Sequence, residues 1–328
     1  NGHITINPTP GGEWTDVQPL GGDAVGGAMS SDGTKQIVTV RNGNIFYSHD
    51  SGITWTENTV GGGSKQWWGC TSSADGTNMV AVVGKTDLGA TGNIWRSVDS
   101  GLTWTEIVVG GGPKRWISIT SGGGTGGEKG GDGSILVAVS HGDGIYYSID
   151  SGLSWTLSLT SAANANAWSG IASSSDGTVV YASAYSGKIW KSINSGQDWI
   201  EISGGIGDPI VSQGMIACSA DGINVYAGTF AQGHKIWISS TSGSSGNWTK
   251  PTSIPDPYNT APYRRFNTLA CSKEGDIVWI SGHYNGIWLS VDSGANFTWE
   301  LGQQSQGGTT DSWGGQLFGT SSNGCVVL

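Results

Sequence analysis

Charged residues are scarce in this chain and make up only 12% of its 328 residues, about half the share usual in globular proteins. The net charge is −10, and no basic run stands against it, which argues against a general affinity for nucleic acid. Long apolar runs are missing too, because no segment approaches about 18 consecutive apolar residues. We therefore expect no membrane span and no nucleic-acid partner.

Cysteine is also rare, and four cysteines in a chain of this length do not make a disulfide framework. Cys218 in "IACSADG" and Cys271 in "LACSKEG" occupy matching positions of a repeat. Neighbouring strands would bring these two together, so a disulfide between them is one alternative. We expect free, buried thiols for both, and also for Cys70 and Cys325.

Histidines are few and lack the HxH or HExxH spacing of a recognisable metal site. We interpret His3, His141, His234 and His283 as polar loop residues, and we expect no metal and no cofactor. One alternative concerns the N-terminus. There Asn1-Gly2-His3 offers an amine, two amide nitrogens and an imidazole, a set that suits Cu(II) or Ni(II).

The chain starts at Asn1 rather than Met, and residues 1–20 show no charged segment followed by an apolar stretch. We interpret it as a mature chain whose targeting segment has been removed, and we expect a secreted, extracellular protein. Asn247 and Asn296 begin glycosylation sequons. Such sites would be used only in a secreted eukaryotic protein.

Glycine and tryptophan, in contrast, are abundant, with 57 and 17 residues, and glycine shows no three-residue period, which excludes collagen. Both recur in one motif: "YSHDSGITWTEN" at 47–58 returns as "WRSVDSGLTWTE" at 95–106 and "YYSIDSGLSWTL" at 146–157. Six copies have their first serine at Ser48, Ser97, Ser148, Ser192, Ser239 and Ser290. A period of about 40–50 residues is typical of propeller blades.

Each repeat unit contains four strand-like segments joined by turns, and no segment has convincing helical periodicity. The C-terminal "WGGQLFGTSSNGCVVL" supplies two strands without the motif, and the N-terminal "NGHITINPTPGGEWTDV" supplies two more. We therefore predict an all-β fold, a single seven-bladed β-propeller whose closing blade is shared by the two termini. The predicted blades are 1–18 with 312–328, 19–60, 61–109, 110–160, 161–203, 204–252 and 253–303.

The residue types of the motif indicate a structural role. An Asp or Ser side chain can accept hydrogen bonds from backbone N–H groups of its own turn, Gly takes backbone angles that other residues avoid, and Trp fills space while its N–H finds a partner. The positions assigned to this role are Asp50, Asp99, Asp150, Asn194, Asp292, Trp55, Trp104, Trp155 and Trp199.

The spacing Ser-x-Asp-x-Gly-x-Thr-Trp is similar to that of the Asp-box, or BNR repeat. Over nearly its whole length the chain resembles the Asp-box propellers, which include sialidases, xyloglucan-active glycosidases, sortilin-type receptor domains and photosystem assembly factors. The resemblance implies a propeller with the motif at the periphery, away from the face that meets a ligand.

The loops that lead from one blade to the next place aromatic residues where the inner strands start. Trp67, Trp116, Trp168 and Trp313 either pack the mouth of the channel or serve as stacking platforms for sugar rings. Trp68 follows Trp67 directly, so one member of this pair should be less buried than the other.

The longest of these loops is "IPDPYNTAPYRRFN" at 254–267, and long loops in compact domains are often functional. We expect it to bind a ligand beside two residues of the next connection. The candidates are Tyr258, Tyr263, Arg264, Arg265, His283 and Tyr284. The alternative is a covering loop whose arginines pair with Asp208 and Asp256.

Enzyme signatures are incomplete. The resemblance to sialidases implies three arginines that grip a carboxylate and an Arg-Ile-Pro motif, and this chain lacks that motif. A glycosidase needs two carboxylates beside the scissile bond, and Asp143, Asp208 and Asp311 are unpaired candidates. We predict a secreted, non-enzymatic module that binds a glycan or an extracellular protein. The alternatives are an Asp-box glycoside hydrolase and a structural subunit of an extracellular assembly.

Overall fold

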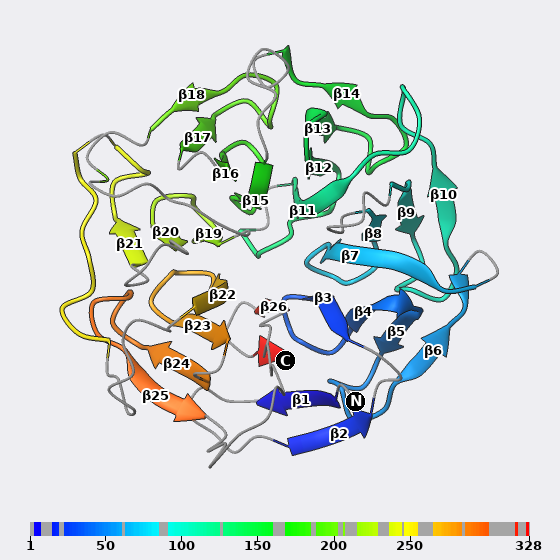
Figure 1. Cartoon of the computed structure of the whole chain (residues 1–328), viewed down its shortest axis with the longest axis horizontal. Helices are drawn as coiled ribbons and strands as arrows, with labels where there is room; N and C mark the ends of the chain where they lie inside the picture. The colour runs from blue at the N-terminus through cyan, green and yellow to red at the C-terminus, as the bar shows by residue number, and fades with distance from the viewer. Residues whose placement is uncertain are drawn as a thin grey trace.

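The computed structural model describes most of the repeat units. The described residues are 3–7, 15–19, 23–60, 63–84, 91–124, 127–159, 168–184, 188–202, 206, 215–228, 236–244, 246–254, 265–283, 286–301, 319–320 and 326–327. They lie almost entirely in strands and turns, and the strands form small antiparallel sheets arranged around a common centre (Figure 1).

Successive strands of the chain pair with their neighbours in sequence. The first two sets of four are β3 (Ala24–Met29), β4 (Gln36–Gly43), β5 (Ile45–Ser48) and β6 (Thr56–Asn58), then β7 (Lys65–Ser72), β8 (Met79–Val83), β9 (Ile94–Ser97) and β10 (Thr105–Ile107). The third set is β11 (Trp116–Gly122), β12 (Ile135–Ser140), β13 (Gly144–Ser148) and β14 (Thr156–Leu157).

The remaining sets continue the same order. They are β15 (Trp168–Ser173), β16 (Val180–Ala184), β17 (Ile189–Ser192) and β18 (Ile200–Glu201), then β19 (Ile216–Cys218), β20 (Val225–Gly228) and β21 (Ile236–Ser239), then β22 (Arg265–Cys271), β23 (Val278–His283), β24 (Gly286–Ser290) and β25 (Thr298–Leu301). The first strand of each set lies towards the centre (Figure 1).

The two ends of the chain lie in one sheet. Its strands are β1 (His3–Asn7), β2 (Thr15–Pro19), β26 (Gly319–Thr320) and β27 (Val326–Val327), in the spatial order β2-β1-β27-β26. Ile6 pairs with Val327 and Asn7 with Val326. Strands from opposite ends of the sequence therefore meet side by side (Figure 1).

The core follows from the composition of the strands. Every residue of β8, "MVAVV", is buried, as expected for a strand covered on both faces. The inner strands carry small residues that let neighbouring sheets approach each other. At Gly26 of β3, an added Cβ would lie 2.6 Å from the Trp68 carbonyl oxygen of β7, so only glycine fits this position.

One pairing joins two sets of strands. β4 continues to Gly43 and pairs with β7, with Arg41 opposite Gln66 and Gly43 opposite Lys65. The sequence predicts separate blades, whereas here the first two sets form one eight-stranded sheet. The physical reason is that β4, with eight residues, extends past its own partners and reaches the start of the next inner strand.

Because the strands alternate in direction, the ring has two chemically distinct ends. We call one the motif end: it carries the turns that follow the first and third strands of each set, including the repeated motif. We call the other the loop end: it carries the starts of the inner strands and the connections that follow the second strands. The repeated motif lies at the motif end, and the described candidate ligand-binding residues lie at the loop end.

Candidate functional site

At the motif end, the repeated motif uses its polar groups on its own turn. Asp99 accepts hydrogen bonds from the Ser97 hydroxyl (2.8 Å), from the Thr103 amide (2.8 Å) and from the Thr103 hydroxyl. The Gly101 amide donates to the Ser97 hydroxyl oxygen (2.9 Å), and the Trp104 indole N–H donates to the Gly101 carbonyl (3.0 Å). The carboxylate is therefore committed to holding the turn.

Four of the other copies repeat this arrangement with small substitutions, whereas the fifth has Thr241 in place of the aspartate, and its Trp248 indole N–H has no hydrogen-bond partner among the described residues. Asp50 and Asp150 accept from Thr54 and Ser154 in the same way. In the fourth copy Asn194 replaces the aspartate, and its side-chain oxygen still accepts from the Asp198 amide at 2.9 Å. In the sixth copy Asp292 accepts hydrogen bonds from both the backbone amide and the side-chain amide of Asn296.

These hydrogen bonds also set the ionisation of the motif carboxyls. The hydroxyl and amide of Thr54 hold the pKa of Asp50 below its ordinary value, and the Asn296 amide does the same for the pKa of Asp292. Burial opposes ionisation of Asp99, but the hydrogen bonds from Thr103 outweigh it and the pKa is lowered. Carboxyls with lowered pKa values do not serve as general acids near neutral pH.

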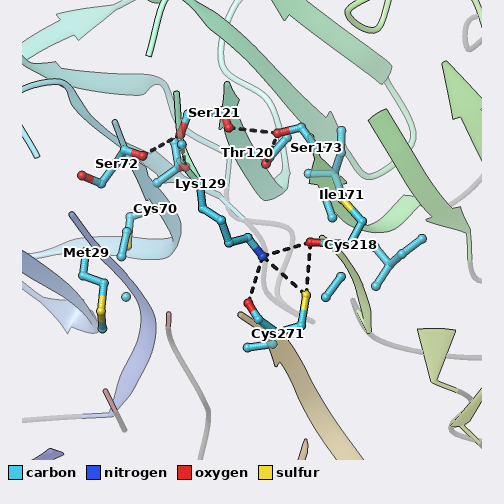
Figure 2. A pocket seen from close by; sticks show the side chains of 18 of the residues that line it. Met29, Cys70, Ser72, Thr120, Ser121, Lys129, Ile171, Ser173, Cys218 and Cys271 are labelled. Atoms are coloured by element: carbon cyan, nitrogen blue, oxygen red, sulfur yellow. Dashed lines mark hydrogen bonds between the residues drawn. The ribbon is translucent and has the colours of Figure 1, made fainter. Parts of the chain in front are cut away.

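The centre of the ring holds a cavity of about 190 Å³ that is open to solvent and is lined by inner strands of six sets and by Lys129. Lys129 comes from the β11–β12 connection and crosses the centre to the opposite side of the ring (Figure 2). Its ammonium donates to the carbonyl oxygens of Cys218 (2.9 Å) and Cys271 (3.0 Å). Glu128, next to it, forms an ion pair of 2.6 Å with Lys273.

Sequence reasoning missed Lys129, although a signal was present. The connection between β11 and β12 spans residues 123–134, whereas the corresponding connection between β7 and β8 spans only 73–78. A turn of double length in one repeat indicates an inserted function, and here the insertion ties the third set to the fifth and sixth.

Hydroxyl groups along the cavity wall donate their hydrogen bonds to one another and to backbone carbonyl groups, and not into the cavity. The Ser121 hydroxyl donates to the Ser72 carbonyl (2.7 Å), so the Thr71 hydroxyl must donate to Ser121 (2.9 Å). The Ser173 hydroxyl donates to the Ser121 carbonyl (2.9 Å), so Thr120 must donate to Ser173 (2.9 Å). This ladder (Figure 2) links three sheets and uses the hydroxyl protons.

The cysteines near the cavity are free thiols. The Cys271 thiol donates to the Cys218 carbonyl (3.1 Å), and burial raises the pKa of Cys218 to about 12. Cys218 and Cys271 are buried, while Cys70 is half-buried. The expected free thiols are confirmed at these three positions, and the alternative of a Cys218–Cys271 disulfide is not realised. Cys325 lies outside the described residues.

At the loop end, three of the candidate tryptophans belong to the core. Trp67, Trp116 and Trp168 are each 1% exposed. Trp67 meets Trp95 edge-on with ring centroids 6.1 Å apart, and Trp116 meets Tyr146 in the same way at 5.3 Å. Because these rings expose no face, they offer no stacking platform in this structure.

Trp68 differs from its neighbour Trp67. Its side chain is half-buried, and the Arg41 guanidinium carbon lies 5.0 Å from the centroid of its ring. Arg41 belongs to the end of β4 that pairs with β7. Sequence reasoning did not single out Arg41, because only the extra strand pairing brings it next to Trp68.

Two of the other ligand-binding candidates lie in described strands and five do not. Tyr258, Tyr263, Arg264, Tyr284 and Trp313 lie outside the described residues. Arg265 and His283 are described in the backbone, where β22 pairs with β23 and sets Arg265 opposite His283 at the loop end.

The described residues contain neither a metal-site cluster nor a membrane-spanning helix. Within these ranges, no three His, Cys, Asp or Glu side chains come together as a metal site would require. In the same part of the chain, no helix has the length and apolar character needed to cross a membrane.

No protein-family model and no curated protein matches the sequence. Among solved structures, the chain is similar to YCF48 bound to a D1 peptide, with a TM-score of 0.61 and 15% identity over 86% of this chain and 82% of that one. It is also similar to YCF48 from Cyanidioschyzon merolae, with a TM-score of 0.61 and 12% identity over 99% and 98%.

A third similar structure is a GH74 xyloglucanase from Xanthomonas campestris, with a TM-score of 0.64 and 14% identity. The match covers 88% of this chain but 47% of the xyloglucanase, so the chain spans about half the length of that enzyme. All three are β-propeller proteins of the Asp-box type. At these identities the likeness shows the fold, and the chain is a β-propeller.

Proposed function

We propose that this protein is a seven-bladed propeller that binds a segment of a partner protein at its loop end, without catalysis. The sheet β2-β1-β27-β26 supports closure of the ring by both termini, with the blade boundaries given by the sequence. One of the similar propellers is a structure of YCF48 with a D1 peptide, which makes a peptide a reasonable first ligand to test.

One observation carries this proposal: the motif aspartates are committed to their own turns, whereas a loop-end arginine keeps hydrogen-bond donors that no described residue uses. At the motif end, carboxylates such as Asp50 and Asp99 already bond to their own turns. At the loop end, the guanidinium of Arg41 lies over half-buried Trp68, forms a long ion pair of 4.0 Å with Asp23, and donates no hydrogen bond to another described residue. Arginine and tryptophan are the side chains most enriched at binding hot spots.

A glycan is the second candidate ligand, because a partly exposed tryptophan is also a surface on which a sugar ring can stack. The xyloglucanase among the similar structures adds the hydrolase alternative, which needs two carboxylates on either side of a glycosidic bond. Extracellular location remains part of the proposal on the sequence alone, and fractionation of the source cells tests it.

The test is one preparation of the full chain screened against a displayed library of random peptides, a glycan array and chromogenic glycosides. Enrichment of peptides supports the proposed function. Retention of glycans without peptides favours the second candidate, and cleavage of a glycoside overturns the non-enzymatic assignment. A preparation that retains neither peptides nor glycans overturns the binding function.

A further inference from the structure

The backbone around Arg41 is held by two sets of strands. The Arg41 amide donates to the Asp23 carbonyl at 2.8 Å, and the same segment pairs with β7 through Gln66 and Lys65. Asn42 takes a φ of 55°, and the Gln66 side-chain amide donates to its side-chain oxygen. A segment fixed in this way loses little conformational entropy when a ligand binds.

The Arg41 side chain is also oriented in advance. Its guanidinium lies over the Trp68 ring with 5.0 Å between the carbon and the centroid, an arrangement that favours one plane for the fork of N–H donors. Asp23 forms a long ion pair with Arg41: its carboxylate oxygen is 4.0 Å from Nη1, beyond hydrogen-bond range, and the Asp23 side chain is 76% exposed.

Another arginine of the chain shows what a structural role looks like. The Nε of Arg96 donates to the Ser151 carbonyl of the next motif at 2.6 Å, so its guanidinium ties two blades together. Arg41 has no such bond to any residue in the described part of the chain, although its side chain is only 34% exposed. It therefore combines restricted orientation with unused donors.

We propose that Arg41 is the point at which the ligand is recognised, and that it binds a carboxylate of an acidic peptide through paired N–H donors, with Trp68 as the support of its plane. This inference rests on the proposed function and names the chemistry of its ligand. A carboxylate is favoured over a phosphate dianion, because Asp23 lies close enough to repel a second negative charge.

The experiment uses fluorescein-labelled hexaglutamate peptide and the full chain at low ionic strength, read by fluorescence anisotropy. Uncharged hexaglutamine, a phosphoserine peptide of equal length and a labelled oligogalacturonate are the comparison probes. We expect saturable binding of hexaglutamate and weak binding of hexaglutamine. Arg41→Ala should weaken hexaglutamate binding by about tenfold or more, and Arg41→Lys should restore only part of it because lysine lacks the planar fork.

Lys188→Ala is the matched control. Lys188 is also a loop-end cation, paired with Glu201 at 2.7 Å, so its removal changes the net charge equally. Equal weakening by Lys188→Ala and Arg41→Ala, or no saturable binding of hexaglutamate, overturns the inference. Preference for the phosphoserine peptide or the oligogalacturonate overturns the assigned ligand class. Library peptides that bind regardless of Arg41 would leave the proposed function standing and refute this inference alone.

Discussion

The motif end and the loop end are made from the same strands, yet the motif aspartates and the loop-end Arg41 put their polar groups to opposite uses. At the motif end, an aspartate such as Asp99 accepts three hydrogen bonds from its own turn. At the loop end, Arg41 is held in place by stacking and keeps its donors unused by described residues. This comparison indicates that repeated features hold the fold together, whereas a feature found in a single blade is a candidate for the binding site.

The same comparison explains the acidity of the chain. Besides the motif, the turns after the inner strands are capped by aspartates whose carboxylates accept from backbone amides two residues on. These are Asp32, Asp75, Asp132, Asp176 and Asp221. Much of the net charge of −10 therefore comes from aspartates that hold turns. The net charge for this reason carries little information about the ligand.

Acid unfolding is the largest of the predicted effects that test this comparison between the two ends of the ring. The pKa values of Asp50, Asp99, Asp150 and Asp292 are lowered in the folded state. Their stabilisation is therefore fully present above the unfolded pKa of about 3.9 and is lost as the pH falls through the folded values. We expect the melting temperature to drop steeply between about pH 5 and pH 2.

Replacing titrating groups with amides isolates the cause of that drop. The fourth motif already works with Asn194 in this position, so the triple variant Asp50→Asn, Asp99→Asn, Asp150→Asn should fold and show a shallower dependence over the same pH range. Melting curves that fall equally steeply in parent and variant would assign acid unfolding to other groups.

The largest effect of a single substitution is expected within the loop end, where two adjacent tryptophans separate frame from site. Trp67 is 1% exposed, so Trp67→Ala should cost about 3–5 kcal/mol of unfolding free energy through the cavity it leaves. Trp68→Ala removes a half-buried ring and should cost clearly less. Denaturant titration of both variants measures the difference, and equal losses would show that Trp68 is also a core residue.

Removal of one acid at each end tests the comparison more directly. Asp99→Ala removes three hydrogen bonds that hold the turn, each with a net contribution of about 0.5–1.5 kcal/mol, and should cost about 1–3 kcal/mol in all. Asp143→Ala at the loop end removes one bond from the Ser140 hydroxyl (3.0 Å) and should cost under about 1 kcal/mol. If Asp143→Ala proves the more damaging in denaturant titration, the loop end is also built as a frame.

The sequence predicted the part of the molecule that repeats. The motif led us to expect an aspartate bonded within its turn and a tryptophan N–H bonded nearby, as found at Asp50 and Trp55. Such contacts span only a few residues, so their pattern is visible in the sequence. The strand order follows for the same reason, because each strand pairs with its neighbour in the chain.

Contacts between distant segments were not predictable in this way. Lys129 meets carbonyl groups 89 and 142 residues further along the chain, and no local pattern in "GGEKGGDG" records those partners. Arg41 and Trp68 meet because β4 runs past its own blade, which depends on register rather than composition. Burial of Trp67 next to half-buried Trp68 follows from strand alternation, which predicted the difference between the pair.

Removal of one lysine at each end is the last test, with an expected difference similar to that for the two acids. Lys129→Met keeps the length of the side chain but removes the ammonium that donates to the carbonyl groups of Cys218 and Cys271, so it should cost about 1–3 kcal/mol. Lys188→Met breaks an ion pair with Glu201 whose lysine side chain is 48% exposed, and such surface pairs contribute about 0–1 kcal/mol.

Chemical denaturation of both variants at moderate salt measures the two costs under equal change of charge. A larger loss for Lys129→Met shows that the insertion between β11 and β12, in the third set of strands, stabilises the ring from its centre. An equal, small loss would mean that water replaces the ammonium at those carbonyls, and the insertion would then need another explanation than stability.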